Sequence, residues 1–243
     1  MMQKVAWYAH EDAHEVSPGE DPLEENPIPG LLRFEGDEMV TAWHLDGIDT
    51  VIFDMDGTLI DSRYDWVAIR EALEIEGHSI IDELNRLESP KREEKWELLR
   101  HFEHEASLTA EVKDGAVDLL AFLREKGVNT ALVTNNSLDN VTFLLDRFNL
   151  AFDTVLTRDS GLYKPSGAPL LEVMRRLGVR PEQCMYVGDY LYDIQAGREA
   201  GCGTVCLVFD RRFCAEADIS FSDLRALLSY LKRAPGPRES DTF

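Results

Sequence analysis

The sequence contains no apolar run approaching the roughly 20 residues that a transmembrane helix needs. Its first residues lead directly into charged positions and lack the apolar segment of a signal peptide, so we expect no secretory targeting. With 243 residues, of which 44% are apolar and 29% charged, the composition is that of a globular chain with one large domain, or one domain with a modest insertion. We therefore expect a cytoplasmic protein that does not act on membranes.

Positive charge is also in short supply. The chain has 25 Lys and Arg residues against 46 Asp and Glu residues, which gives a formal net charge of −21 at pH 7. A surface of this sign repels the phosphate backbone of nucleic acids, and no local cluster of basic residues offsets it. We therefore expect no nucleic-acid partner.

Cysteine is scarce, and the four present, Cys184, Cys202, Cys206 and Cys214, have no C-x-x-C spacing. This pattern is typical of small buried thiols in a reducing compartment and argues against a disulfide framework or a zinc site. The phosphate-loop pattern G-x-x-x-x-G-K is absent, and no serine has the His and Asp context of a serine hydrolase. The sequence thus predicts neither a P-loop kinase nor a serine hydrolase.

The two ends of the chain differ in character from its middle. Residues 1–47 hold eleven acidic residues against Lys4 and Arg33, together with a run rich in Pro, Gly and Glu, which predicts an acidic arm. Within it, residues 31–45 have the pattern of a short β-hairpin. Residues 234–243 are typical of a loose tail.

Between these ends, strand and helix patterns alternate. Apolar, β-branched runs predict strands at 50–53, 129–133, 152–156, 184–187 and 203–208, with helices of about ten residues between the later ones. This alternation predicts an α/β fold, a Rossmann-like parallel sheet with helices on both faces. Residues from about 64 to 112 show helical spacing and no strand pattern, so we expect a core of 48–62 and 114–233 with an all-helical insert at 63–113.

Polar residues follow the predicted strands. They are Asp54 and Asp56, then Thr134 and Asn135, then Lys164 on a loop, and finally Asp189 and Asp193. The carboxyl ends of parallel strands meet at one edge of a sheet, so we expect these side chains to share a site. Four carboxylates in one cleft repel one another unless a cation neutralises them, and oxygen ligands favour Mg²⁺. Lys164 and Thr134 are suited to hold the oxygens of a phosphoryl group, which predicts a phosphate site.

The spacing of Asp54 and Asp56 supports a separate prediction about catalysis. Alternation along an extended chain puts both carboxyl groups on the same side. One can attack phosphorus, and the other can protonate the leaving oxygen and later deprotonate water. Taken alone, however, this pair is more typical of a strand followed by an acidic turn.

The complete set is more specific. Asp-Met-Asp-Gly-Thr-Leu at 54–59, Val-Thr-Asn at 133–135, Lys164-Pro165 and Gly-Asp-x-x-x-Asp at 188–193 occur in this order, each after a predicted strand. From about residue 49 to 208 the chain resembles the haloacid dehalogenase-like hydrolase superfamily. In that family the helical insert, placed between the first two motifs, forms a small cap over the site.

The resemblance implies a role for each matching residue. Asp54 matches the nucleophile and Asp56 the general acid/base. Thr134, with Asn135 beside it, matches the phosphate-binding hydroxyl, and Lys164 the lysine that balances the charge of nucleophile and phosphate. The Mg²⁺ ligands implied are Asp54, the backbone carbonyl of Asp56 and Asp189, with Asp193 as a further ligand or a water-mediated support.

The residue at position 56 distinguishes the reactions that different branches of this family catalyse. The dehalogenase branch uses no acid there and the ATPase branch carries Thr, whereas a phosphatase needs an acid for its leaving group. The segments 56–62 and 193–201 look most like the phosphoglycolate-phosphatase-like group. The insert from Arg63 to Lys113 is 51 residues long, shorter than we expect for that group, which predicts fewer specificity contacts and a more open site.

We therefore expect a Mg²⁺-dependent phosphatase acting on a small phosphomonoester through an aspartyl-phosphate. Two alternatives stay open: a phosphomutase on the same core, and a catalytically idle regulatory or binding protein that uses its acidic arm. Arg63 either binds a second anionic group of the substrate or is a solvated hinge residue. No pattern in the sequence fixes the substrate or the oligomeric state.

Overall fold

The structure is a computed structural model that describes residues 34–35, 38–39, 47–77, 79–207 and 216–233. Most of the predicted acidic arm and the whole predicted tail lie outside these residues. Within the arm, the two-residue strands β1 (Phe34–Glu35) and β2 (Glu38–Met39) pair in antiparallel orientation.

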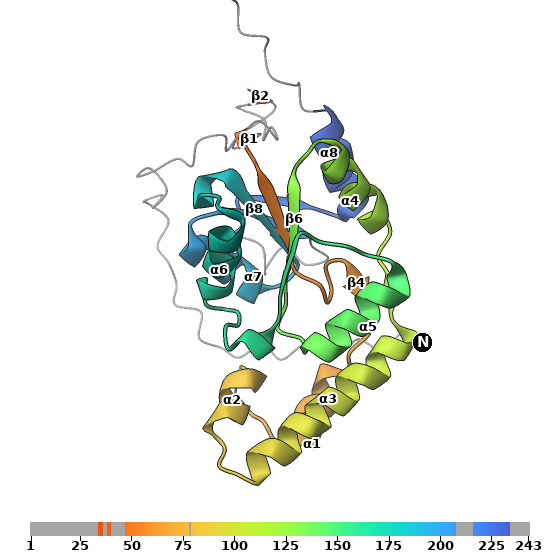
Figure 1. Cartoon of the computed structure of the whole chain (residues 1–243), viewed down its shortest axis with the longest axis vertical. Helices are drawn as coiled ribbons and strands as arrows, with labels where there is room; N and C mark the ends of the chain where they lie inside the picture. The colour runs from red at the N-terminus through yellow and green to blue at the C-terminus, as the bar shows by residue number, and fades with distance from the viewer. Residues whose placement is uncertain (1–33, 36–37, 40–46, 78, 208–215, 234–243) are drawn as a thin grey trace, which may run out of the picture.

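A six-stranded sheet forms the centre of the molecule (Figure 1). Its strands are β3 (Thr50–Phe53), β6 (Asn129–Val133), β7 (Thr154–Leu156), β8 (Cys184–Gly188), β9 (Gly203–Leu207) and β10 (Ile219–Phe221). All neighbours pair in parallel, in the order β10–β9–β8–β3–β6–β7. The predicted α/β class with a parallel sheet is confirmed.

Helices cover both faces of this sheet (Figure 1). Three of them, α4 (Ala116–Glu125), α5 (Leu138–Phe148) and α8 (Leu224–Arg233), share one apolar core with the sheet. On the other face lie α6 (Ala168–Leu177) and α7 (Leu191–Ala200). The central strand β3 is buried on both sides, since Phe53 belongs to the first core and Ile52 to the second. This double burial explains its continuous apolar run.

The helical insert comes after β3, which is the first strand of the six-stranded sheet in chain order. It consists of α1 (Trp66–Leu73), α2 (Ile80–Arg86) and α3 (Lys91–Thr109), and it joins the core through the antiparallel pair β4 (Ile60–Asp61) and β5 (Glu111–Val112). Its helices bury a small apolar cluster of their own, which includes Leu73, Leu84 and Leu99. The insert therefore has its own core beside the main domain.

Three details differ from the sequence predictions. The edge strand β10 was not predicted, because Ile219 and Phe221 are only partly buried, Ser220 between them is exposed, and the three form no apolar run. The expectation of no strand in 64–112 is wrong at β5, whose two residues are too few to produce a pattern. Cys184 and Cys202 are buried free thiols, whereas Cys206 is disulfide-bonded, so the prediction of free thiols is wrong there.

No helix in the described part of the chain is long and apolar enough to cross a membrane.

Candidate active site

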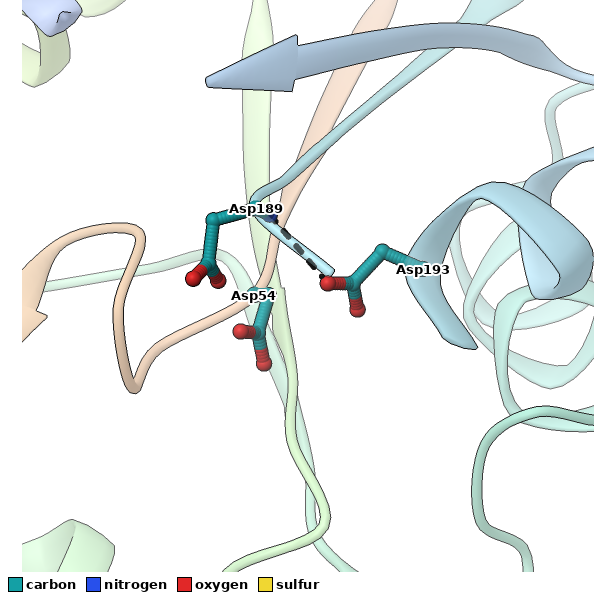
Figure 2. A group of neighbouring side chains, drawn as sticks. All are labelled: Asp54, Asp189 and Asp193. Atoms are coloured by element: carbon teal, nitrogen blue, oxygen red, sulfur yellow. Dashed lines mark hydrogen bonds between the residues drawn. The ribbon is translucent and has the colours of Figure 1, made fainter. Parts of the chain in front are cut away.

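Three carboxylates gather at the carboxyl edge of the sheet, two of them after neighbouring strands and the third on a helix (Figure 2). Asp54 follows β3, and its backbone N–H donates to the carbonyl of Val187 in β8 at 2.9 Å. Asp189 follows β8, and Asp193 lies in the first turn of α7. One oxygen of each of the three carboxylates lies within 4.8 Å of the others, so they form a group that could hold a metal ion. The predicted convergence of Asp54, Asp189 and Asp193 is thus present.

Lys164 lies between two of these carboxylates. Its Nζ is 2.6 Å from Asp54 Oδ1 and 2.6 Å from Asp193 Oδ1, and all three side chains are buried. Burial disfavours the charged ammonium, but the carboxylates of Asp193 and Asp54 outweigh it and raise the pKa of Lys164 above its usual value. The lysine is therefore a fixed positive charge inside the site.

Asp193 is held by several donors besides Lys164. The hydroxyl of Tyr186 in β8 donates to Oδ1 at 2.9 Å. The backbone N–H groups of Asp189 and Tyr190 donate to Oδ2 at 3.2 Å and 3.0 Å, and Figure 2 shows the first of these bonds. Both oxygens of Asp193 are thus engaged by the protein, and its carboxylate also caps the N-terminus of α7.

The carboxylate of Asp189 lies where a side chain at position 57 would otherwise be, so Gly57 is needed beside it. Gly57 has a φ of +87°, and a Cβ built there would lie 2.3 Å from Asp189 Oδ2. This position therefore requires glycine for its conformation and for the close approach. The hydroxyl of Thr58 donates to Asp189 Oδ1 at 3.1 Å and fixes the orientation of the carboxylate.

The buried charges at this edge do not balance. Burial, followed by the charges of Asp193 and Asp189, raises the pKa of Asp54, while Lys164 opposes the rise. Burial and the charge of Asp193 likewise raise the pKa of Asp189 to about 6. Burial is the largest cause of both shifts, and repulsion among three carboxylates that share Lys164 adds to it. A set of oxygen donors in this condition fits a hard divalent cation.

Asp56 lies in a separate cradle of polar side chains. Ser62 Oγ donates to its Oδ1, and Asn136 Nδ2 donates to its Oδ2 at 3.0 Å. Asn136 Nδ2 also donates to the hydroxyl of Tyr64 at 2.9 Å. Burial raises the pKa of Asp56, and the bonds from Ser62 and Asn136 oppose the rise. A partly buried carboxyl with a raised pKa binds a proton more readily than an exposed one and is suited to proton transfer.

The two residues predicted after β6 lie at the same edge. Thr134 is buried, and its hydroxyl accepts from the backbone N–H of Asn136 at 3.1 Å. Asn135 bonds to the backbone of Lys164 in both directions: its Nδ2 donates to the carbonyl at 2.9 Å, and its Oδ1 accepts from the N–H at 2.8 Å. Asn135 therefore fixes the loop that carries the lysine.

Arg63 is occupied by acidic neighbours on the surface. Its guanidinium pairs with Glu111 of β5 at 2.5 Å and lies 3.5 Å from Asp61 of β4. Its side chain is 56% exposed, and its φ of 51° places it in the left-handed region at the start of the insert. This arrangement fits the hinge interpretation of Arg63, and its binding of a second anionic group of the substrate stays a prediction.

Four residues of this edge were not predicted as site residues. Asn136 directly follows the pair predicted after β6, Thr58 belongs to the first motif, and Ser62 follows that motif. Of the four, only Tyr186 could have been predicted from the sequence, because a hydroxyl inside a fully buried strand needs a hydrogen-bonding partner. The roles of the other three depend on side-chain directions that spacing does not reveal.

The long insert helix α3 is anchored to the core by a buried ion pair. Glu103 of α3 accepts two hydrogen bonds from Arg158, which follows β7, one of them at 2.7 Å, and both side chains are at most 5% exposed. Arg158 also donates to the carbonyl of Asn135 at 2.9 Å and lies 5.0 Å from the ring of Trp96. One guanidinium thus links the insert to the segment that holds Lys164.

We expect Glu103→Gln to destabilise the protein by about 3–5 kcal/mol, because it leaves the Arg158 guanidinium buried without a counter-charge. For a chain of this size this corresponds to a fall of roughly 10 °C in the thermal unfolding midpoint. Glu105→Gln, on the exposed face of the same helix, is the matched control and should change the midpoint little. Equal, small shifts in the two variants would contradict the anchoring role.

Known proteins share this sequence and architecture. A phosphoglycolate phosphatase of Shigella boydii is 31% identical over 200 residues, which cover 79% of this chain and 75% of the relative. An N-acetylmuramic acid 6-phosphate phosphatase of Pseudomonas aeruginosa is 28% identical over 217 residues, which cover 77% of this chain and 96% of the relative.

Solved structures are similar to this chain as well. The crystal structure of a hydrolase from Pseudomonas syringae superimposes with a TM-score of 0.65 at 23% identity, covering 76% of this chain and 98% of that one. The family profile described as haloacid dehalogenase-like hydrolase matches residues 48–201, a span that contains Asp54, Lys164 and Asp193. The chain therefore belongs to the haloacid dehalogenase-like hydrolase family.

Proposed function

We propose that this protein is a Mg²⁺-dependent phosphatase that hydrolyses a small phosphomonoester through an aspartyl-phosphate on Asp54. One observation carries the proposal: a buried carboxylate bonded to a lysine lies at the same sheet edge as a second carboxyl in a polar cradle. The first arrangement suits a nucleophile, and the second suits a proton donor. The two relatives described above are named as phosphatases of small phosphorylated molecules, which supports the same reaction class.

In the first step, an oxygen of Asp54 attacks phosphorus opposite the leaving group. The bond from phosphorus to the ester oxygen breaks, and its electron pair stays with that oxygen, which takes a proton from Asp56. The products of this step are the free alcohol, an aspartyl-phosphate and a deprotonated Asp56. Lys164 stabilises the transferred group, because its ammonium already lies 2.6 Å from the attacking side chain.

In the second step, Asp56 takes a proton from water while the water oxygen attacks phosphorus. The bond between phosphorus and Asp54 breaks and restores the carboxylate, and inorganic phosphate leaves. Asp56 thus ends the cycle protonated, as it began. The raised pKa of its partly buried carboxyl supports both proton transfers.

Asp54, Asp189 and the backbone carbonyl of Asp56 are the groups that would hold Mg²⁺. The cation would offset the excess negative charge and polarise a phosphoryl oxygen. We assign Asp193 the supporting role, since its oxygens already accept from Lys164, Tyr186 and two backbone amides. Thr134 is the proposed phosphate-binding hydroxyl.

The helical insert at 63–113 is the proposed cap, and the group attached to the phosphate would meet it. Loops and inserts over a rigid sheet commonly set specificity in this way. The predicted partner is therefore a small phosphorylated molecule, with no role for nucleic acid.

The test is phosphate release from a panel of phosphomonoesters, each assayed with Mg²⁺ and with a chelator. The panel contains phosphoglycolate, sugar phosphates, nucleotides and an aryl phosphate. We expect release from at least one ester and a loss of about 100-fold or more on chelation, because a bound cation contributes several kcal/mol to the transition state. Re-addition of Mg²⁺ should restore the rate.

The folded state is monitored by circular dichroism in the same buffers. Full activity in chelator would overturn the metal assignment alone. No release from any ester by folded, Mg²⁺-loaded protein would overturn the phosphatase proposal and favour phosphoryl transfer between sugar phosphates, or a binding role.

A further inference from the structure

Asn136 uses every hydrogen-bonding position of its side-chain amide. Its two N–H groups donate to Asp56 Oδ2 at 3.0 Å and to the Tyr64 hydroxyl at 2.9 Å. Its Oδ1 accepts from the backbone N–H of Ser137 at 2.8 Å and from Asn140 Nδ2 at 3.1 Å. A buried amide with two donors and two acceptor positions all engaged has a single orientation.

That orientation determines what Asn136 offers to Asp56. The N–H of Ser137 can only donate, so the amide atom facing it is the oxygen. The nitrogen of Asn136 therefore faces Asp56, and Oδ2 of that carboxyl must accept. The remaining oxygen, Oδ1, faces the hydroxyl of Ser62, which can donate or accept. The two oxygens of Asp56 are consequently unequal: Oδ2 is held as an acceptor by Asn136, whereas Oδ1 can carry a proton once the Ser62 hydroxyl turns from donating to accepting.

Asn136 is itself connected to the insert. Asn140 of α5, which donates to Asn136, accepts at its Oδ1 from the hydroxyl of Ser107 in α3 at 2.6 Å. Ser107 and Asn140 are both buried. A continuous chain of side-chain hydrogen bonds thus runs from the insert helix through α5 to the carboxyl group of Asp56.

We propose that Asn136 is a positioning residue that fixes the orientation of the Asp56 carboxyl and makes Oδ1 the oxygen that delivers the proton to the leaving group. The inference rests on the proposed function, since it assigns Asp56 as the proton donor. It adds a residue to which neither the sequence motifs nor the comparisons give a role. Its effect is specific to the step in which the ester bond breaks and the departing oxygen takes up a proton.

Leaving-group dependence separates this role from a structural one. An alcohol with a high pKa needs a proton as its bond to phosphorus breaks, whereas p-nitrophenolate leaves without one. We expect Asn136→Leu to lower kcat/KM for the best alkyl phosphate of the panel by about tenfold or more. For p-nitrophenyl phosphate the loss should stay within about threefold. Asp56→Asn should show the same selectivity with a larger loss.

A double-mutant cycle tests whether the two residues act together. If Asn136 acts through Asp56, adding Asn136→Leu to Asp56→Asn should reduce kcat/KM no further. Asn129→Leu is the matched control, because Asn129 lies at the opposite end of β6, and it should change neither substrate's rate. Asn136→Ala repeats the measurement with a smaller side chain, and thermal unfolding midpoints show which variants fold.

The outcomes distinguish the two proposals. Selective loss on the alkyl ester together with a non-additive cycle supports the positioning role. Equal loss on both esters in folded variants, or losses that simply multiply in the double variant, would overturn that role and leave the phosphatase proposal standing. If the unmodified protein hydrolyses neither ester, the proposed function fails, and this inference fails with it.

Discussion

Replacing Asp54 by asparagine is expected to lower phosphate release by about 10⁴-fold or more, with little loss of stability. A side-chain amide at this position would not attack phosphorus, so the proposed covalent step would have no nucleophile. Nucleophile substitutions in other covalent enzymes cost on the order of 10⁶-fold in kcat, and uncatalysed hydrolysis of phosphate monoesters is among the slowest known reactions. A steady-state assay on the best substrate of the panel measures the effect.

The fold should survive this substitution because it removes one negative charge from a cluster with too many. Burial and two neighbouring carboxylates already disfavour the charged form of Asp54. Lys164 keeps its second partner, Asp193, at 2.6 Å. Asp146→Asn, at an exposed position of α5, is the control and should keep full activity. A folded Asp54→Asn protein with nearly full activity would disprove the nucleophile assignment.

Lys164→Met is expected to cost both stability and activity. The substitution leaves Asp54 and Asp193 buried without the ammonium they share, and breaking a buried ion pair in this way costs about 3–5 kcal/mol. Catalysis should fall by about 100-fold or more, because a charge that stabilises the transferred phosphoryl group is lost. Chemical denaturation and the phosphate-release assay measure the two effects separately.

The stability loss in Lys164→Met should grow with pH. Without the lysine, burial raises the pKa of Asp54 further above its value in the unfolded chain. The folded state then binds more protons than the unfolded state between the two pKa values, so the free energy of unfolding falls as pH rises through that range. We therefore expect a larger deficit at pH 8 than at pH 5. Lys91→Met removes an exposed pair with Glu74 and should show almost no deficit at either pH.

Much of the fold and the first layer of the site could be predicted from the sequence. The continuous apolar run of β3 is buried on both faces, and the alternation with helices fixes a parallel sheet. Parallel strands bring their carboxyl ends together, so Asp54, Lys164 and Asp189 could be placed near one another from chain position alone. This inference succeeds because it depends on topology and not on side-chain direction.

The surroundings of these residues could not be predicted in the same way. The cradle of Asp56 depends on which way Asn136 turns after β6, and two adjacent asparagines look alike in sequence. The partnership of Glu103 and Arg158 joins positions 55 residues apart, and each alone is typical of an exposed charge. The ion pairs of Arg63 with Asp61 and Glu111 could not be predicted either, because these partners belong to β4 and β5, whose two-residue strands form no pattern in the sequence.

The place of β3 at the centre of the sheet has a consequence for how the molecule is made. β3 is synthesised first among the six strands, yet its two neighbours are β6 and β8, and Lys164 follows Asp54 by 110 positions. A growing chain therefore carries an apolar strand with an open edge until β8 has left the ribosome, and such edges favour wrong pairing. Contacts between residues that lie this far apart in the sequence also slow folding. Because Asp189 and Asp193 come after β8 in the chain, the cluster of three carboxylates is completed only when the sheet closes around its first strand. A chain that terminates before β8 would lack two of these three carboxylates.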